Sequence, residues 1–207
     1  TPTSKKNEFS KGDYLIAPRA ATELIPVSPR RATEVLVVLT IMVIAMGGMI
    51  RIYDAGESCP DWPTCFGTFG FDISEEEQGE WWNENPDEAD SRGSGHRYTT
   101  FEIFTEWFHR LLAGMFVGPL VILNWFLVRR DFWNSPRVRG VSSLTLALIL
   151  WQGAIGWLTV KFDNENWSVA IHLGSALAFM ISLIWLWIEI RRDEDDLPKW
   201  VNFDPLV

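Results

Sequence analysis

Residues Phe101–Val128 read FEIFTEWFHRLLAGMFVGPLVILNWFLV, and residues Ser168–Ile190 read SVAIHLGSALAFMISLIWLWIEI. Both stretches are apolar over at least the ~20 residues that a helix needs to cross about 30 Å of hydrocarbon. Ala32–Ile52 and Val141–Phe162 are two further stretches of this kind. Isolated strands cannot satisfy their backbone groups in lipid. We therefore predict an all-α integral membrane protein, a four-helix transmembrane bundle.

Arginine residues set the expected orientation, because basic residues in short loops mark the cytoplasmic side. They precede the first span, fill the connection between the second and third, and follow the fourth: Arg30, Arg31, Arg129, Arg130, Arg137, Arg139, Arg191 and Arg192. We expect both termini to be cytoplasmic in a multi-pass protein of the plasma membrane. The predicted organisation is a polar tail over residues 1–31, a transmembrane domain over 32–190 and a second tail over 191–207.

The long segment 53–100 between the first two spans is then extracytoplasmic. Its part from Asp72 to Asp90 is rich in acidic residues, and we expect a solvated, partly disordered loop there. Trp81 and Trp82 interrupt the acidic run, and we expect them to rest on the membrane interface. The whole chain has a net charge of −9, which argues against a nucleic-acid partner and leaves membrane lipid as the expected surroundings.

His109 and His172 lie inside the second and fourth predicted spans. Ionisable residues inside a membrane usually mark a functional site. At 1.5 Å per residue, His109 is about 12 Å and His172 roughly 6 Å from the extracytoplasmic start of its span. These depths agree within the error of the boundaries, and neutral imidazole is a common axial ligand of haem iron. We predict that the pair binds one haem between facing helices; the alternative is two independent histidines, each hydrogen-bonded inside the bundle.

Other metal and histidine assignments are less favoured. Zinc would need a cysteine or a third histidine at the same depth, and the spans contain neither. His96 lies in the polar loop and is expected to be exposed.

Glu106 lies three residues before His109 and shares its helix face. A carboxylate at this place can orient a ligand or accept protons during an oxidation. Glu102 lies one turn further out, where we expect a solvated residue that suits the start of the helix.

Three further polar residues are candidates for contact with a cofactor. Arg51 and Arg110 lie near the outer boundary, where they can pair with haem propionates or extend to lipid headgroups. Gln152 is an amide inside the third span that needs a partner, either another helix or a cofactor group. Glycines in the spans are interpreted as sites of close helix packing, with close approach to a porphyrin as an additional use: Gly47, Gly48, Gly114, Gly118, Gly153 and Gly156.

The chain has two cysteines, Cys59 and Cys65, in the segment SCPDWPTC just beyond the first span. An oxidising outer compartment allows a disulfide there. Two thiols are too few for a structural metal site. A structural disulfide is favoured, and a redox-active pair stays open as the alternative.

Four motifs together resemble the haem A synthase family: GGMIRIYDAGESCPDWPTCFG (Gly47–Gly67), EWFHRLLAG (Glu106–Gly114), WQGAIGWLTVK (Trp151–Lys161) and IHLGSALAF (Ile171–Phe179). The resemblance covers one half of the usual eight-helix protein. It implies oxidation of a methyl group of haem O to the formyl group of haem A by successive hydroxylations, in support of cytochrome oxidase biogenesis. It also implies that His109 and His172 are the axial pair, that Glu106 is the essential carboxylate, and that the two cysteines form the outer-loop disulfide.

The chain departs from that family in its number of histidine pairs. The usual protein has two four-helix halves, one pair for the substrate haem and one for a resident haem b, whereas this chain has a single pair. We therefore expect a homodimer or a second four-helix half. The alternative function is a subunit of a respiratory complex that carries haem B for electron transfer, and a third is a haem-free structural subunit.

Overall fold

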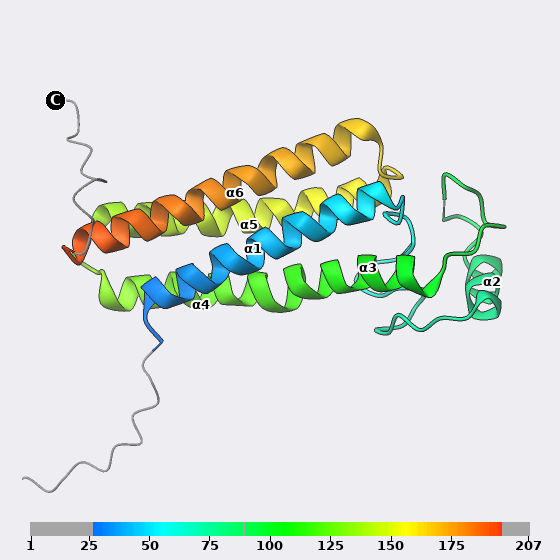
Figure 1. Cartoon of the computed structure of the whole chain (residues 1–207), viewed down its shortest axis with the longest axis horizontal. Coiled ribbons are helices and arrows are strands. Elements are labelled where there is room, and N and C mark those ends of the chain that lie inside the picture. Colours follow the sequence, from blue (N-terminus) through cyan, green and yellow to red (C-terminus); the bar gives the residue numbers. More distant parts are fainter. Residues whose placement is uncertain (1–26, 89, 196–207) are drawn as a thin grey trace, which may run out of the picture.

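The computed structural model describes residues 27–88 and 90–195. In this part of the chain, four helices are long and apolar enough to cross a membrane: α1 (Pro29–Ile52), the continuous helix Thr100–Asp131, α5 (Pro136–Lys161) and α6 (Asn166–Asp193). The predicted all-helical class with four spans is confirmed (Figure 1). The predicted tails 1–31 and 191–207 lie largely outside the described residues.

The helices begin earlier than the hydrophobic pattern alone indicates. Ser28 accepts a hydrogen bond from the backbone N–H of Arg31, and Pro29 takes the first helical position of α1. Pro136 likewise begins α5 after Ser135. Proline suits this position because its missing N–H has no partner in the first turn.

The second span has an irregular middle. α3 (Thr100–Leu111) continues into a π-helical segment, η1 (Leu112–Val117), and then into α4 (Gly118–Asp131). Pro119 cannot donate a backbone hydrogen bond and disturbs the preceding turn, and the N–H of Gly118 bonds to the carbonyl of Ala113 instead. The irregular segment begins three residues after His109.

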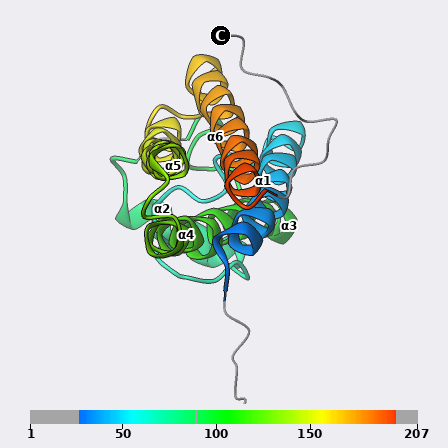
Figure 2. The ribbon, with the colours of Figure 1, turned by 90° about the vertical axis from the view of Figure 1, so that its left-hand side faces the viewer.

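The four spans form a bundle in which α1 contacts α6, α6 contacts α5, α5 contacts α4, and α4 contacts α1 (Figure 2). α3 also contacts α1. The second and fourth spans are therefore diagonal to each other and run in the same direction. Large apolar side chains on the outer surface suit a lipid environment; they include Val38, Ile41, Phe126, Leu150 and Ile181.

One end of the bundle, called here the loop end, carries the connection 53–99 and the tight turn between α5 and α6 (Figure 1). Asp163 and Asn164 in this turn both have positive φ, which aspartate and asparagine tolerate better than most residues. The side chain of Asn164 donates to the carbonyl of Gly56 at 2.8 Å and so joins the two connections. The other end, called the terminal end, carries Val27, Asp195 and the connection between α4 and α5.

The acidic segment is folded, which corrects the expectation of a partly disordered loop. Glu75–Glu84 form helix α2, and Ser74 and Glu77 form a capping box at its start. Gln78 is buried, donating to the carbonyl of Tyr98 and accepting from its N–H. Trp82 is buried against Phe66 rather than resting on a membrane interface. Acidic residues thus occupy the first turn and the exposed face of a helix whose other face packs inward.

Candidate functional site

The two intramembrane histidines come together from diagonal helices. His109 lies in the last turn of α3, and His172 lies in the second turn of α6. The imidazole of His172 is within electrostatic range of His109, and Glu106 is within range of both rings. Three residues that the sequence assigned to one site are therefore within electrostatic range of one another. Their role as ligands and catalytic group stays a prediction.

Each histidine ring packs against a glycine of a neighbouring helix. A Cβ added at Gly47 of α1 would lie 3.4 Å from Cε1 of His109. A Cβ added at Gly156 of α5 would lie 3.1 Å from Cε1 of His172. The distance at Gly156 is shorter than an ordinary carbon–carbon contact, so this glycine gives the His172 ring its room, whereas the distance at Gly47 is at the lower edge of an ordinary contact.

His172 is held by side chains on two helices. The Gln152 side-chain amide on α5 lies 3.1 Å from Nδ1 of His172 and donates to its backbone carbonyl at 3.1 Å. Ser175 donates to the Gln152 amide oxygen at 2.5 Å. The partner that Gln152 was expected to need is therefore His172. This contact fixes the ring, as the partners of metal-bound histidines generally do.

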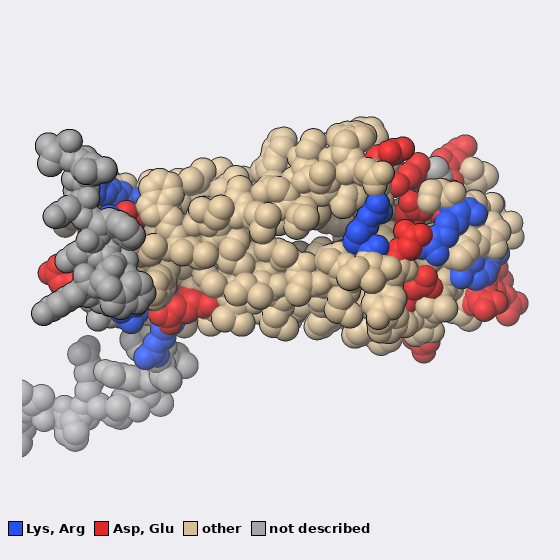
Figure 3. Space-filling model, turned by 45° about the horizontal axis from the view of Figure 1, so that its top comes forward, with Lys and Arg blue, Asp and Glu red and all other residues tan. Residues whose placement is uncertain are grey.

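His109 differs, because its buried Nδ1 atom has no regular hydrogen-bond partner among the described residues, and the ring is instead approached by the backbone of Val43 on α1. Buried polar atoms nearly always have a partner, so an orphaned imidazole nitrogen fits a position that a further group completes. Figure 3 shows a hollow between the long helices towards the loop end, beside basic side chains. Two imidazoles in electrostatic range, one of them with an orphaned nitrogen, are a donor set of the kind that holds haem iron.

Glu106 is buried and forms an ion pair with Arg110, in which Nε of the arginine lies 2.6 Å from Oε1 of the glutamate. Arg110 was expected to pair with propionates or extend to headgroups. In the structure its guanidinium does neither: besides the ion pair with Glu106, it donates to backbone carbonyls of the disulfide-closed segment. The predicted disulfide between Cys59 and Cys65 is present, with an S–S length of 2.06 Å.

The remaining polar candidates lie around this centre. Arg51 is exposed, and its Nη2 donates to the side chain of Asn166 at 2.6 Å, joining α1 to α6. Glu102 caps its own helix by accepting from the N–H of Thr99 at 2.8 Å. His96 is half-buried rather than exposed, because its Nε2 lies 3.0 Å from the guanidinium of Arg92.

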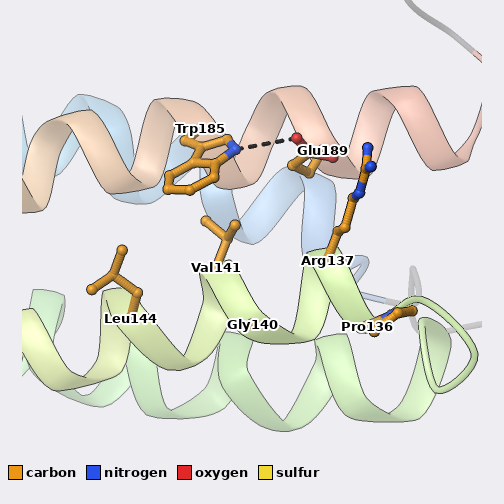
Figure 4. Close-up of a pocket in the computed structure, with 7 residues that line it drawn as sticks. All are labelled: Pro136, Arg137, Gly140, Val141, Leu144, Trp185 and Glu189. Atoms are coloured by element: carbon orange, nitrogen blue, oxygen red, sulfur yellow. Dashed lines mark hydrogen bonds between the residues drawn. The ribbon is translucent and has the colours of Figure 1, made fainter. Parts of the chain in front are cut away.

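A separate groove of about 430 Å³ lies between α5 and α6 at the terminal end, away from the histidines (Figure 4). Val141, Leu144 and Trp185 form much of its wall. Glu189 lies in the groove, where it accepts hydrogen bonds from Trp185 at 3.1 Å and from Arg192 at 2.9 Å.

Sequence reasoning missed Ser175 and Glu189. Ser175 lies three residues after His172 on the same helix face, a spacing that could have indicated a shared contact. Glu189 is a carboxylate near the end of an apolar span, and an ionisable residue in a span indicates a candidate functional site. The ion pair of Arg110 with Glu106 had a signal in the sequence, since the two residues are four apart on one helix, but its contacts with the segment between the cysteines had none, because those partners are backbone carbonyls.

Comparison with known proteins gives a consistent result. The COX15-CtaA family model, described as cytochrome oxidase assembly protein, matches residues 30–205. A protein named heme A synthase from Shewanella oneidensis is 30% identical over 176 residues, which cover 84% of this chain and 50% of that protein. A heme A synthase from Novosphingobium aromaticivorans is 28% identical, over 84% of this chain and 53% of its own length.

Heme A synthase COX15 from Saccharomyces cerevisiae is 27% identical, over 94% of this chain and 44% of its own length. The chain therefore spans about half the length of the curated relatives that it matches. No solved structure matches it.

Proposed function

The chain belongs to the COX15-CtaA family of cytochrome oxidase assembly proteins, and from that premise we propose that it is a haem A synthase-like membrane oxidoreductase. In this proposal it binds haem O between His109 and His172 and oxidises one methyl group of the porphyrin to the formyl group of haem A, with the electrons passing to an external acceptor and the oxygen atom supplied by water or dioxygen. The product would serve the assembly of cytochrome oxidase.

The observation that supports the proposal is the electrostatic interaction among His109, His172 and Glu106, which come from two diagonal spans. The two imidazoles are within electrostatic range of each other, and the carboxylate is within range of both. A haem that only transfers electrons needs the two ligands but not the carboxylate. Glu106 therefore favours the enzyme over the electron-transfer subunit.

The residues of this chain divide the work as follows. The neutral imidazoles of His109 and His172 would hold the haem iron. Gln152 and Ser175 keep the His172 ring in place. Bound haem would bring the iron and the methyl group on which the oxidation takes place. Glu106 would accept protons released from that methyl group, and Arg110 supplies its countercharge.

Arg51 is the proposed propionate contact, since it lies exposed at the loop end between α1 and α6. The guanidinium fork matches a carboxylate in shape. Arg110 is less suited to this role because Glu106 and backbone carbonyls already bind its guanidinium.

The proposed topology has the terminal end in the cytoplasm and the loop end outside the plasma membrane. Basic residues cluster around the terminal end, as they do on cytoplasmic sides. The disulfide at the loop end suits an oxidising compartment. Since the chain spans about half of its relatives, we further propose that two copies associate, because a symmetric dimer is the commonest oligomer.

A pigment analysis of the purified full chain tests this function. The chain is produced in a host that makes haem O and lacks its own haem A synthase, and the extracted porphyrin is identified by pyridine haemochrome spectra and mass spectrometry. We expect haem O and haem A. Haem B alone would favour electron transfer, and a colourless protein would overturn both functions.

Substitutions assign the residues. His109→Ala and His172→Ala should each remove most of the bound haem, whereas His96→Ala in the outer segment should remove none. Glu106→Gln should keep haem and stop formyl formation, with Glu102→Gln, one turn away on the same helix, as the matched control. A Glu106→Gln protein that makes haem A at the normal rate would contradict the catalytic assignment.

A further inference from the structure

The guanidinium of Arg110 joins the centre of the site to the segment that the disulfide closes. Its Nε donates to Oε1 of Glu106 at 2.6 Å, and its Nη2 donates to the carbonyl of Cys59 at 2.7 Å. Its Nη1 donates to the carbonyls of Asp61 at 2.6 Å and of Thr64 at 3.3 Å. One half-buried side chain thus contacts both the proposed proton acceptor and the backbone of the outer segment.

All three carbonyls belong to the ring that Cys59 and Cys65 close, whose cysteines have Cα atoms 4.5 Å apart. Backbone carbonyls of residues this close in the chain do not normally point at one atom group. They converge on a single cation here because the chain between the cysteines folds back on itself. The carboxylate of Asp61 supports the same shape, since it accepts from the backbone N–H of Gly67 at 3.0 Å. The disulfide ring therefore binds one guanidinium through three of its backbone carbonyls.

We propose that Arg110 is a positioning residue that couples closure of the disulfide ring to the orientation of Glu106. With the ring closed, three carbonyls fix the guanidinium, and the guanidinium fixes the carboxylate beside the histidines. With the disulfide reduced, the ring relaxes, and Arg110 and Glu106 become free to move. The importance of this coupling for catalysis rests on the function proposed above, but the coupling itself can be measured without haem.

Coupling between two places is reciprocal, so loss of Arg110 must also weaken the closed ring. Dithiothreitol provides the necessary reaction. It transfers two electrons and two protons to the S–S bond, giving thiols at Cys59 and Cys65, while dithiothreitol itself closes to a cyclic disulfide. The ratio of reduced to oxidised dithiothreitol at half-reduction measures how strongly the fold favours the closed ring.

The experiment compares these midpoints in the full haem-free chain in lipid nanodiscs, with free thiols counted by maleimide gel shift. Arg110→Ala should make the disulfide easier to reduce by about tenfold, which is about 30 mV for a two-electron couple. Arg97→Ala is the matched control, because Arg97 also donates to three backbone carbonyls, those of Glu75, Ser94 and His96, but to none in the disulfide ring. Equal midpoints for Arg110→Ala and the unsubstituted chain would overturn the proposal.

Arg110→Lys keeps the experiment decisive if the alanine variant does not fold. A lysine ammonium retains the charge but lacks the fork that bridges a carboxylate and several carbonyls. We expect a shift of the same direction and smaller size. No shift in a folded Arg110→Lys protein would likewise count against the coupling.

An infrared measurement on the unsubstituted chain tests the same link from the side of Glu106. Reduction of the disulfide should change a carboxylate band that is missing from the Glu106→Gln spectrum, and Arg110→Ala should abolish this change. A reduction spectrum without any Glu106 band would refute the coupling. If the coupling holds but Glu106→Gln still makes haem A, the proposed function fails alone. If Glu106→Gln is inactive but midpoints and bands do not respond, only the coupling fails.

Discussion

Gly156→Ala is the substitution for which the structure gives the sharpest expectation. The added methyl group would lie 3.1 Å from Cε1, 3.7 Å from Nδ1 and 3.8 Å from Nε2 of His172. An ordinary carbon–carbon contact begins near 3.5 Å, so the ring has to move away by about 0.4 Å or more. Its Nδ1 is only 3.1 Å from the Gln152 amide, and a displacement of this size disturbs that contact.

The expected loss of haem affinity follows from the role of the Gln152 contact in orienting His172. Disturbing the groups that orient a metal ligand typically costs 10–100-fold in affinity, or about 1.4–2.8 kcal/mol. Gly47→Ala should have a smaller effect, because its added methyl group would lie 3.4 Å from His109. Gly153→Ala is the control on the same helix, since an added Cβ there meets nothing within 4 Å. Alanine also stabilises a helix by up to about 1 kcal/mol relative to glycine, so Gly153→Ala should raise thermal stability.

The assay is titration of the haem-free variants with haem, followed by Soret absorbance and by the haem-to-protein ratio after purification. We expect haem affinity to decrease in the order Gly153→Ala, Gly47→Ala, Gly156→Ala. Equal affinity of Gly156→Ala and Gly153→Ala would refute the reasoning, because it would mean that the position of the His172 ring against α5 has no bearing on haem binding.

Two further predictions concern stability. Asn124→Ala removes the buried hydrogen bond of 2.9 Å from Asn124 on α4 to Thr33 on α1, and thermal unfolding should show a loss of about 0.6–1.7 kcal/mol that Asn134→Ala, in the exposed α4–α5 connection, does not show. Burial raises the pKa of Glu57 above its ordinary value of 4.5, so its contribution to stability is complete below pH 4.5 and is lost as pH rises through the folded pKa. Hydrogen bonds of the capping box lower the pKa of Glu77, so its contribution is present above pH 4.5 and is lost as pH falls through the folded pKa. Glu57→Gln and Glu77→Gln should therefore change the pH dependence of hydrogen exchange in the outer segment with opposite signs, and equal signs would contradict the assignment.

The transmembrane part of the fold could be predicted from the sequence because lipid leaves few choices. A backbone in hydrocarbon must satisfy its hydrogen bonds within each helix, so apolar length alone identifies the spans. The starts at Pro29 and Pro136 lie three and five residues before the predicted ones, at Ser-Pro pairs whose value as a helix start the hydrophobic pattern does not include. The proximity of His109 and His172 could be predicted because they have similar depths in two spans that run in the same direction.

The connection 53–99 could not be predicted in the same way. Its acidic composition is typical of a solvated chain, but Gln78 and Trp82 recur at helical spacing, and this short amphipathic pattern is easily missed among charges. The contacts of Arg110 were beyond reach for a different reason. Carbonyl oxygens are present at every residue, so only the folded path of the chain shows which of them converge on a side chain.

The positions of the two histidines also indicate how the site is constructed. His109 follows α1 in the chain and packs against Gly47 of α1, and His172 follows α5 and packs against Gly156 of α5. Each half of the bundle is thus a helix pair in which a glycine of the first helix makes room for a histidine of the second. The halves differ in the hydrogen bonds of the rings, since Gln152 binds His172 and no described residue binds Nδ1 of His109. One four-helix unit therefore supplies both of the proposed ligands, with the His172 ring held by Gln152 and the His109 ring lying beside the backbone of Val43, so under the proposed function a second copy is not needed to supply the second histidine.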